Sequence, residues 1–261
     1  MENLIHLKYE EQGHILILSL NRPEKSNAIN TQLLLDLSEA LRRGANDEKV
    51  RVVVLMAEGE RFSVGADIDE IKGFTSPADY ESFFSLFHNT LRRLESLPKP
   101  TIAAIHGFAL GGGCELSLAA DVRIAAEGAS FGLPEIKLGA LPGAGGTQRL
   151  PRIVGEAKAL EMIFTGDVIG AEEGHRIGLL NKVVPSTKLK DEAMDLARRL
   201  EKGPPLALRT AKLLIKQGLN MDLGAALEFE IKSVSLLAAT DDQQEGFRAF
   251  LEKREPRFVG R

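Results

Sequence analysis

Two glutamates within apolar stretches are the residues of this chain best suited to acid and base chemistry. Glu115 lies two residues after the triplet Gly111-Gly112-Gly113, and Glu135 follows a proline in the stretch 131–136. An unpaired carboxylate is costly to bury, so each acid needs a partner or a function. Taken singly, either could be a hydrogen-bonded structural glutamate. Together they form a pair whose pKa values burial and neighbours can separate, leaving one as a base and one as an acid.

Two glycine-containing turns could supply backbone donors to a negatively charged oxygen. The glycine triplet lies where an apolar run meets a helical pattern, so a ligand can approach first-turn amides that have no partner within the helix. A second turn, residues 62–68, could direct another amide to the same oxygen. Two such donors would stabilise an enolate. Glycine also forms tight turns without any ligand, so both interpretations stay open at this point.

An alternation of apolar runs and amphipathic segments must position these residues. The runs predict strands within residues 13–22, 50–57, 101–109 and 122–126. Helices are predicted from the leucine spacing after Asn30 or Thr31, from Ser76-Pro77 to about Leu97, and over residues 114–120. This order predicts an α/β fold whose helices pack against a mainly parallel sheet.

The sequence after about residue 187 has a helical pattern rich in alanine, leucine and charged residues. It is interrupted at Gly203-Pro204-Pro205 and at Gly218. We therefore predict a core over residues 1–200 and a helical region over residues 201–261. The apolar positions between residues 206 and 250 are more than a thin appendage can bury alone, which predicts an oligomer.

Composition and motif spacing exclude several other classes of protein. Cys114 is the single cysteine, so an intrachain disulfide is impossible, and the five histidines show no metal-ligand spacing. The 33 basic and 37 acidic residues give a net charge of −4, which offers no broad positive field to nucleic acid. The aliphatic runs are too short to span a membrane, and the N-terminus lacks a signal-peptide pattern. We expect a cytoplasmic protein that binds no metal, nucleic acid or membrane.

One segment matches the motif of a different enzyme class. Gly128-Ala129-Ser130-Phe131-Gly132 fits the Gly-x-Ser-x-Gly pattern of serine hydrolases. That pattern requires a strand-to-helix elbow and a later histidine, and only His175 follows. The hydrolase interpretation is therefore weak.

Three runs of the sequence together resemble the enoyl-CoA hydratase/isomerase (crotonase) family. They are AIHGFALGGGCEL at residues 104–116, FGLPEIKLG at 131–139 and PGAGGTQRL at 142–150. Residues 21–25 resemble the family's early CoA-contacting loop, and residues 245–254 its C-terminal signature. The resemblance extends over essentially the whole chain. It implies a spiral of ββα units that holds the acyl-CoA site, and a C-terminal helical region in a homotrimer or homohexamer.

Position by position, the resemblance also implies roles for individual residues. Glu115 and Glu135 match the two glutamates of hydratases, and the amides of Val64 and Gly112 match the oxyanion hole. Val64 stands where a smaller alanine is common, which is expected to change the fit of the acyl group but not the amide. The positions that match CoA contacts are Arg22, Lys25, Ala66, Asp67 and Ile68.

The implied function is that of a 2-enoyl-CoA hydratase, which adds water across the α,β double bond of an enoyl-CoA thioester to give 3-hydroxyacyl-CoA in fatty-acid β-oxidation. Glu115 would deprotonate water and Glu135 would protonate Cα. The two glutamates favour this reaction over the alternatives, a Δ3,Δ2-enoyl-CoA isomerase or another hydrolase or lyase of the family. No metal or redox cofactor is expected, because CoA enters as part of the substrate.

A noncatalytic, RNA-binding member of the family is the alternative from another functional class. Such a role would favour an exposed helix rich in lysine. The first predicted helix offers only Arg42-Arg43 before acidic residues follow. The sequence therefore favours an enzyme.

Overall fold

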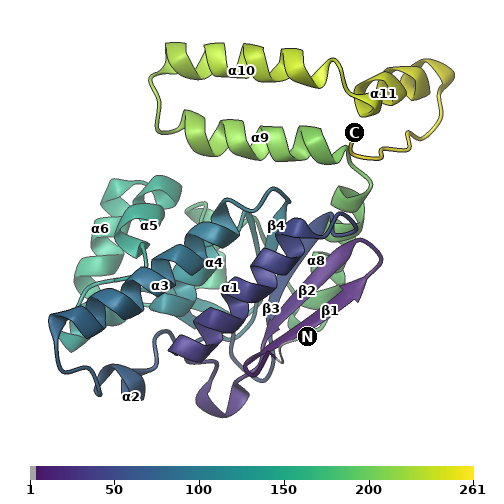
Figure 1. Cartoon of the computed structure of the whole chain (residues 1–261). Coiled ribbons are helices and arrows are strands. Elements are labelled where there is room, and N and C mark those ends of the chain that lie inside the picture. The colour runs from purple at the N-terminus through teal and green to yellow at the C-terminus, as the bar shows by residue number, and fades with distance from the viewer. Residues whose placement is uncertain (1–3) are drawn as a thin grey trace.

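A six-stranded sheet forms the centre of the protein, whose computed structural model describes residues 4–261 (Figure 1). The first two strands pair antiparallel as a hairpin, and every later neighbour is parallel. The predicted α/β alternation is thereby confirmed. In spatial order the strands are β1 (Leu7–Gln12), β2 (Ile15–Leu20), β3 (Val52–Ala57), β4 (Thr101–Ile105), β6 (Val122–Ala126) and β9 (Lys182–Val184).

Both faces of this sheet are buried by helices. Leu16 and Leu18 of β2 enter the core under α1 (Thr31–Asn46) and α3 (Pro77–Glu95). Ile15 and Ile17 of the same strand enter a second core under α8 (Leu189–Glu201). A strand buried on both faces reads as a continuous apolar run, which is the pattern that the sequence shows.

The starts of both long helices follow from their capping residues. The Asn30 side chain accepts a hydrogen bond from the Leu33 amide at 2.9 Å, which identifies Asn30 as the N-cap of α1. At α3, Ser76 and Asp79 form a reciprocal capping box. The helix then ends at Glu95, two residues before the predicted end.

A second, three-stranded sheet corrects the prediction of one strand over residues 101–109. The chain leaves β4 at Ile105 and begins β5 (Phe108–Leu110), which pairs with β7 (Ser130–Gly132) and then β8 (Ile169–Gly170). Gly107 makes the break, with φ at +58°, and a Cβ there would lie 2.2 Å from the Glu60 carbonyl oxygen. The apolar pattern continues across this turn, so periodicity alone does not reveal it.

Shorter helices occupy the connections between the strands. The helix predicted over residues 114–120 begins earlier, as α4 (Gly112–Ala119), and is buried along its whole length. The others are α2 (Ile68–Ile71), α5 (Gly146–Val154), α6 (Glu156–Thr165) and α7 (Ala171–Arg176), with 3-10 turns η1 (Pro23–Lys25), η2 (Pro134–Leu138) and η3 (Ser186–Lys188).

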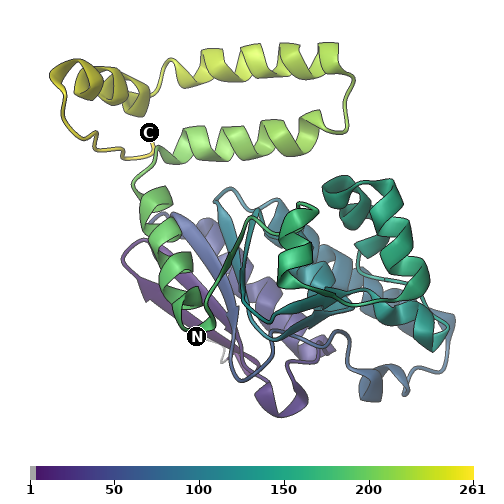
Figure 2. The same cartoon turned by 180° about the vertical axis from the view of Figure 1, so that it is seen from behind.

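The last three helices form a layer of their own beside the core. Both views show α9 (Pro205–Gly218) and α10 (Leu223–Leu237) as an antiparallel pair beyond α8, with α11 (Asp241–Glu252) at its end (Figures 1 and 2). No helix in residues 4–261 is long and apolar enough to cross a membrane. Since α8 ends at Glu201, the architecture changes near residue 200, where the boundary between core and helical region stays a prediction.

Candidate active site

The two glycine turns predicted from the sequence lie against each other. Gly111 turns the chain from β5 into α4 with φ at +51°, and Gly65 has φ at +98°. A Cβ on Gly65 would lie 2.9 Å from the Leu110 carbonyl oxygen and 3.1 Å from the Gly112 nitrogen. Only glycine permits this contact, because both the backbone angle and the space exclude a side chain.

The free amides at this contact belong to Gly112 and Ala66. A Cβ on Gly112 would lie 3.3 Å from the Ala66 nitrogen, so the two amides are neighbours. Neither donates a hydrogen bond to any residue that the structure describes. Gly112 begins α4, whose first-turn amides have no acceptor within the helix.

The Val64 amide, predicted as the second oxyanion donor, is already occupied. It donates to the Ser26 carbonyl oxygen at 3.2 Å. The structure therefore corrects the assignment of Val64 and places Ala66, two residues later, beside Gly112. Gly65 lies between them with φ at +98°, so the chain turns between residues 64 and 66 and their amides face different partners. The sequence alone does not decide which of the two faces the glycine triplet.

Glu115 lies in the first turn of α4 and is only 1% exposed. Its Oε1 accepts hydrogen bonds from the amides of Ala144, at 2.8 Å, and Gly146, at 2.7 Å. Gly146 is the first residue of α5, so the carboxylate caps the positive end of that helix. These donors, which sequence analysis missed, come from the glycine-rich segment 142–150.

The pKa of Glu115 is raised to about 7, first of all by burial. The amide of Gly146 opposes this shift and the neighbouring Glu135 adds to it. A carboxyl group with a pKa near neutrality can accept and release a proton at physiological pH.

Glu135 approaches the same turn from the second residue of η2. Its Oε1 lies 3.0 Å from the position that a Cβ on Gly111 would take. Its Oε2 is buried and has no hydrogen-bond partner among residues 4–261. Burial raises the pKa of Glu135, partly offset by its own backbone amide. A buried carboxyl group beside the Gly111 turn, with a raised pKa and one orphaned oxygen, is suited to hold a proton and donate it.

Cys114 lies between these elements and is chemically inert there. It is fully buried, and burial, followed by the charges of Glu115 and Glu135, raises the pKa of its thiol to about 12. A thiol in that state is no nucleophile. Glu115 and Glu135, with pKa values raised by burial, are therefore better suited than Cys114 to exchange protons at this turn.

The residues predicted to contact CoA lie at η1 and directly after Gly65, at the start of α2. Arg22 forms an ion pair with the buried Asp67 and donates to the Ala28 carbonyl oxygen at 3.0 Å. Lys25 pairs with Asp69 at 2.9 Å on the surface, and Ile68 is exposed. Asp67 thus has a structural role as N-cap of α2 and partner of Arg22.

The serine-hydrolase pattern lacks its structural context. Ser130 begins strand β7, so it lies at no strand-to-helix elbow, and His175 instead contacts the Leu180 carbonyl oxygen at 3.0 Å. Across the part of the chain that the structure describes, no cluster of three His, Cys, Asp or Glu side chains could hold a metal ion.

The sequence pattern of the enoyl-CoA hydratase/isomerase family matches residues 10–261. This chain belongs to that family. It is 41% identical to a crotonyl-CoA hydratase of Syntrophomonas wolfei over the whole chain and 99% of that protein. It is also 41% identical to a short-chain-enoyl-CoA hydratase of Clostridium acetobutylicum, over 94% of each chain.

Solved structures of the family share the fold. An enoyl-CoA hydratase from Bacillus anthracis superposes with a TM-score of 0.95 at 40% identity, over 98% of this chain and 100% of that one. One from Geobacillus kaustophilus gives 0.94 at 41% identity, over 98% and 99%. The expected crotonase-like fold with a C-terminal helical region is therefore confirmed.

The raised pKa of Glu115 makes a prediction about stability. Between about pH 4.5 and pH 7 the folded protein holds a proton that the unfolded chain releases, so this stabilisation is complete below pH 4.5 and is lost as the pH rises through 7. The resulting decrease in the free energy of unfolding is on the order of 3 kcal/mol for such a shift, and Glu115→Gln abolishes it because glutamine does not titrate. From pH 5 to pH 8, the melting temperature of Glu115→Gln should rise relative to that of the parent protein.

The exposed Glu81 of α3 provides the matched control for this measurement. Glu81→Gln should follow the parent protein at every pH. If the melting temperatures of the parent protein and Glu115→Gln changed equally from pH 5 to pH 8, the raised pKa of Glu115 would be contradicted.

Proposed function

We propose that this chain is a 2-enoyl-CoA hydratase that adds water across the α,β double bond of an enoyl-CoA thioester to give 3-hydroxyacyl-CoA. The observation that carries the proposal is the meeting of Glu115 and Glu135, both with raised pKa, at the turn that presents the free amides of Ala66 and Gly112. The similarity to hydratases over the full chain supports it.

The amide pair supplies the electrostatic part of the reaction. Attack of water at Cβ pushes electrons through the conjugated system onto the thioester oxygen. Amides of Ala66 and Gly112 that bind this oxygen stabilise the enolate more than the neutral substrate, and only such a difference accelerates the reaction.

Glu115, ionised, acts as the base. The amides of Ala144 and Gly146 bind its Oε1, which leaves Oε2 to accept a hydrogen bond from the attacking water. As the oxygen–carbon bond forms at Cβ, one proton of the water passes to the Glu115 carboxylate.

Glu135, protonated, acts as the acid. Its buried and orphaned Oε2 needs a proton or a partner, and the enolate Cα receives that proton. Exchange with solvent then returns the pair to its starting state. Isomerisation moves one proton between two carbons and needs a single carboxyl group, so the second carboxyl favours hydration.

The proposed substrate binds with its CoA part beside η1 and α2, near Arg22, Lys25, Ala66, Asp67 and Ile68. This chemistry uses no metal and no redox group, because CoA itself carries the activating thioester. On composition and reaction type, we place the enzyme in cytoplasmic fatty-acid β-oxidation.

The glutamate roles predict the effect of isosteric variants. Glu115→Gln and Glu135→Gln should each lower the turnover of crotonyl-CoA by on the order of 10² to 10⁴ with the fold intact, because each loses one proton transfer and keeps its shape. Loss of the absorbance of the conjugated thioester measures turnover. Near-normal turnover in either variant would show that its assigned role is wrong.

The amide pair can be tested without changing a side chain. A backbone ester at position 66, made by incorporating lactic acid, deletes the Ala66 amide donor and should lower kcat by roughly 10² to 10³. A matched ester at position 64 deletes only the hydrogen bond of Val64 to Ser26 and should leave kcat within about tenfold. The reverse order of effects would return the donor role to Val64.

We further propose that the C-terminal helices join copies of this chain. Apolar side chains on them stand in solvent, among them Leu219 at 76%, Leu223 at 74% and Phe250 at 82% exposure. Large apolar side chains are exposed on all three helices, from Leu213 of α9 through Ile231 of α10 to Leu251 of α11, and such exposure is typical of an interface. We propose that a second copy of this chain covers them, because most soluble oligomers are closed, symmetric assemblies of identical chains.

This assembly predicts a trimer or a hexamer in light scattering at micromolar concentration. Charged substitutions at Leu219 and Leu223, as in Leu219→Glu with Leu223→Glu, should dissociate it because they place unpaired charges in an apolar interface. A parent protein that is monomeric under these conditions would exclude the assembly.

A further inference from the structure

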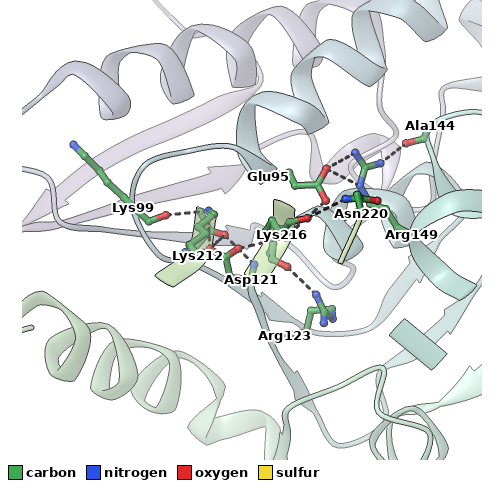
Figure 3. Close-up of polar contacts among 11 residues, drawn as sticks. Glu95, Lys99, Asp121, Arg123, Ala144, Arg149, Lys212, Lys216 and Asn220 are labelled. Atoms are coloured by element: carbon green, nitrogen blue, oxygen red, sulfur yellow. Dashed lines mark hydrogen bonds and ion pairs between the residues drawn. The ribbon is translucent and has the colours of Figure 1, made fainter. Parts of the chain in front are cut away.

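The segment Gly143–Gly146, which binds Glu115 through two amides, is also bonded to the side chain of an arginine. The Nη1 of Arg149 donates to the Ala144 carbonyl oxygen at 3.0 Å, on the same residue whose amide donates to Glu115 (Figure 3). The Nε and Nη2 of Arg149 donate to Oε2 of Glu95 at 3.3 and 3.0 Å. The guanidinium therefore bridges the loop that holds Glu115 and the end of α3.

The packing around this guanidinium leaves it little freedom. Its side chain is 12% exposed, and a Cβ on Gly145 would lie 2.2 Å from Nη1. On the other side of the loop, a Cβ on Gly143 would lie 2.4 Å from the ring of Phe84. His88 of α3 also approaches this loop, with its Cε1 3.8 Å from the position that a Cβ on Gly145 would take. The glycines of the loop therefore allow the guanidinium and two rings of α3 to approach its main chain.

The anchor of the arginine continues into the C-terminal helices. Glu95 also pairs with Lys216 of α9 at 3.7 Å, and Lys216 lies 3.5 Å from Asp121. Asp121 in turn pairs at 2.7 Å with Lys212, whose side chain is 11% exposed and donates to the Lys99 carbonyl oxygen (Figure 3). An ionic chain therefore runs from the loop beneath Glu115 to the helix that begins the C-terminal region.

We propose that Arg149, anchored by Glu95, is the positioning residue of the acid–base pair. By fixing the Ala144 carbonyl, it orients the two amides that hold the Glu115 carboxylate and keeps Oε2 directed at the water. This inference rests on the proposed hydration. It assigns Arg149 no contact with the substrate.

Three kinds of group act on the Glu115 carboxyl from the elements packed around it. The amides of Ala144 and Gly146 and the positive charge of Arg149 favour the ionised form, whereas Glu135 favours the protonated form. Loss of Arg149 removes one favourable charge and loosens the two amides. Both changes should raise the pH at which Glu115 ionises.

The test compares Arg149→Ala with Arg152→Ala, a change of the exposed arginine one turn further along α5, which donates only to the Gln148 carbonyl oxygen. Arg149→Ala should lower kcat for crotonyl-CoA roughly 10- to 100-fold with little change in KM, because the base is misplaced while the substrate contacts stay. The acid limb of its kcat/KM profile should move up by roughly one pH unit. Arg152→Ala should match the parent protein in kcat, in KM and in the acid limb of the kcat/KM profile.

Hydrogen–deuterium exchange supplies a measurement that does not depend on activity. The amides of Ala144 and Gly146 should exchange faster in Arg149→Ala than in Arg152→Ala. Arg149→Lys, which keeps the charge but loses the two-sided fork, should show the fast exchange with a smaller shift of the pH profile. If circular dichroism shows that Arg149→Ala is unfolded, Arg149→Lys takes its place in the comparison.

The outcomes separate the two proposals. If the parent protein does not hydrate crotonyl-CoA, the proposed function fails, while the exchange comparison still decides the role of Arg149. If Arg149→Ala and Arg149→Lys both match Arg152→Ala in exchange, kcat and pH profile, the positioning role is overturned.

Discussion

The site depends on how a carboxylate is stabilised where almost no water reaches it. Glu115 is buried beside a second acid, and without the amides of Ala144 and Gly146 its charged form would be too costly to populate. With them, the balance between burial and hydrogen bonding brings its pKa to about 7. Three features favour the ionised form of Glu115 against burial: the first amide of α5, the amide of Ala144 in the preceding loop, and the charge of Arg149.

Glycine makes the arrangement possible because several of these positions leave no room for a side chain of their own. The contact of Gly65 with Gly112 brings two amides together, and Gly145 admits the Arg149 guanidinium. These positions were visible in the sequence only as turns. Only the structure shows that these glycines share a function, which is to let the main chain approach another main-chain segment or a cation closely.

Sequence reasoning succeeded where periodicity and local capping decide the structure, as in the leucine spacing of α1 and its cap Asn30. It missed β1, whose outer positions are polar because it is an edge strand, and it joined β4 to β5 across Gly107. The family resemblance named Glu115 and Glu135, which the structure brings to the same turn, but it also named the Val64 amide, which is bonded to Ser26. The pairing of Arg149 with Glu95 joins residues 54 positions apart, so no local pattern could reveal it.

The use of main-chain donors at Ala66 and Gly112 has a consequence for how such a protein can diversify. A backbone N–H survives almost any side-chain replacement that keeps the local path of the chain. In the proposed hydratase, the side chain at position 64 can therefore change in size while the amides of Ala66 and Gly112 keep their positions. On the proposed function, the donors of the chemical step and the side chains around them are thus separable parts of one turn, so descendants of one ancestor could change the side chains and inherit the donors.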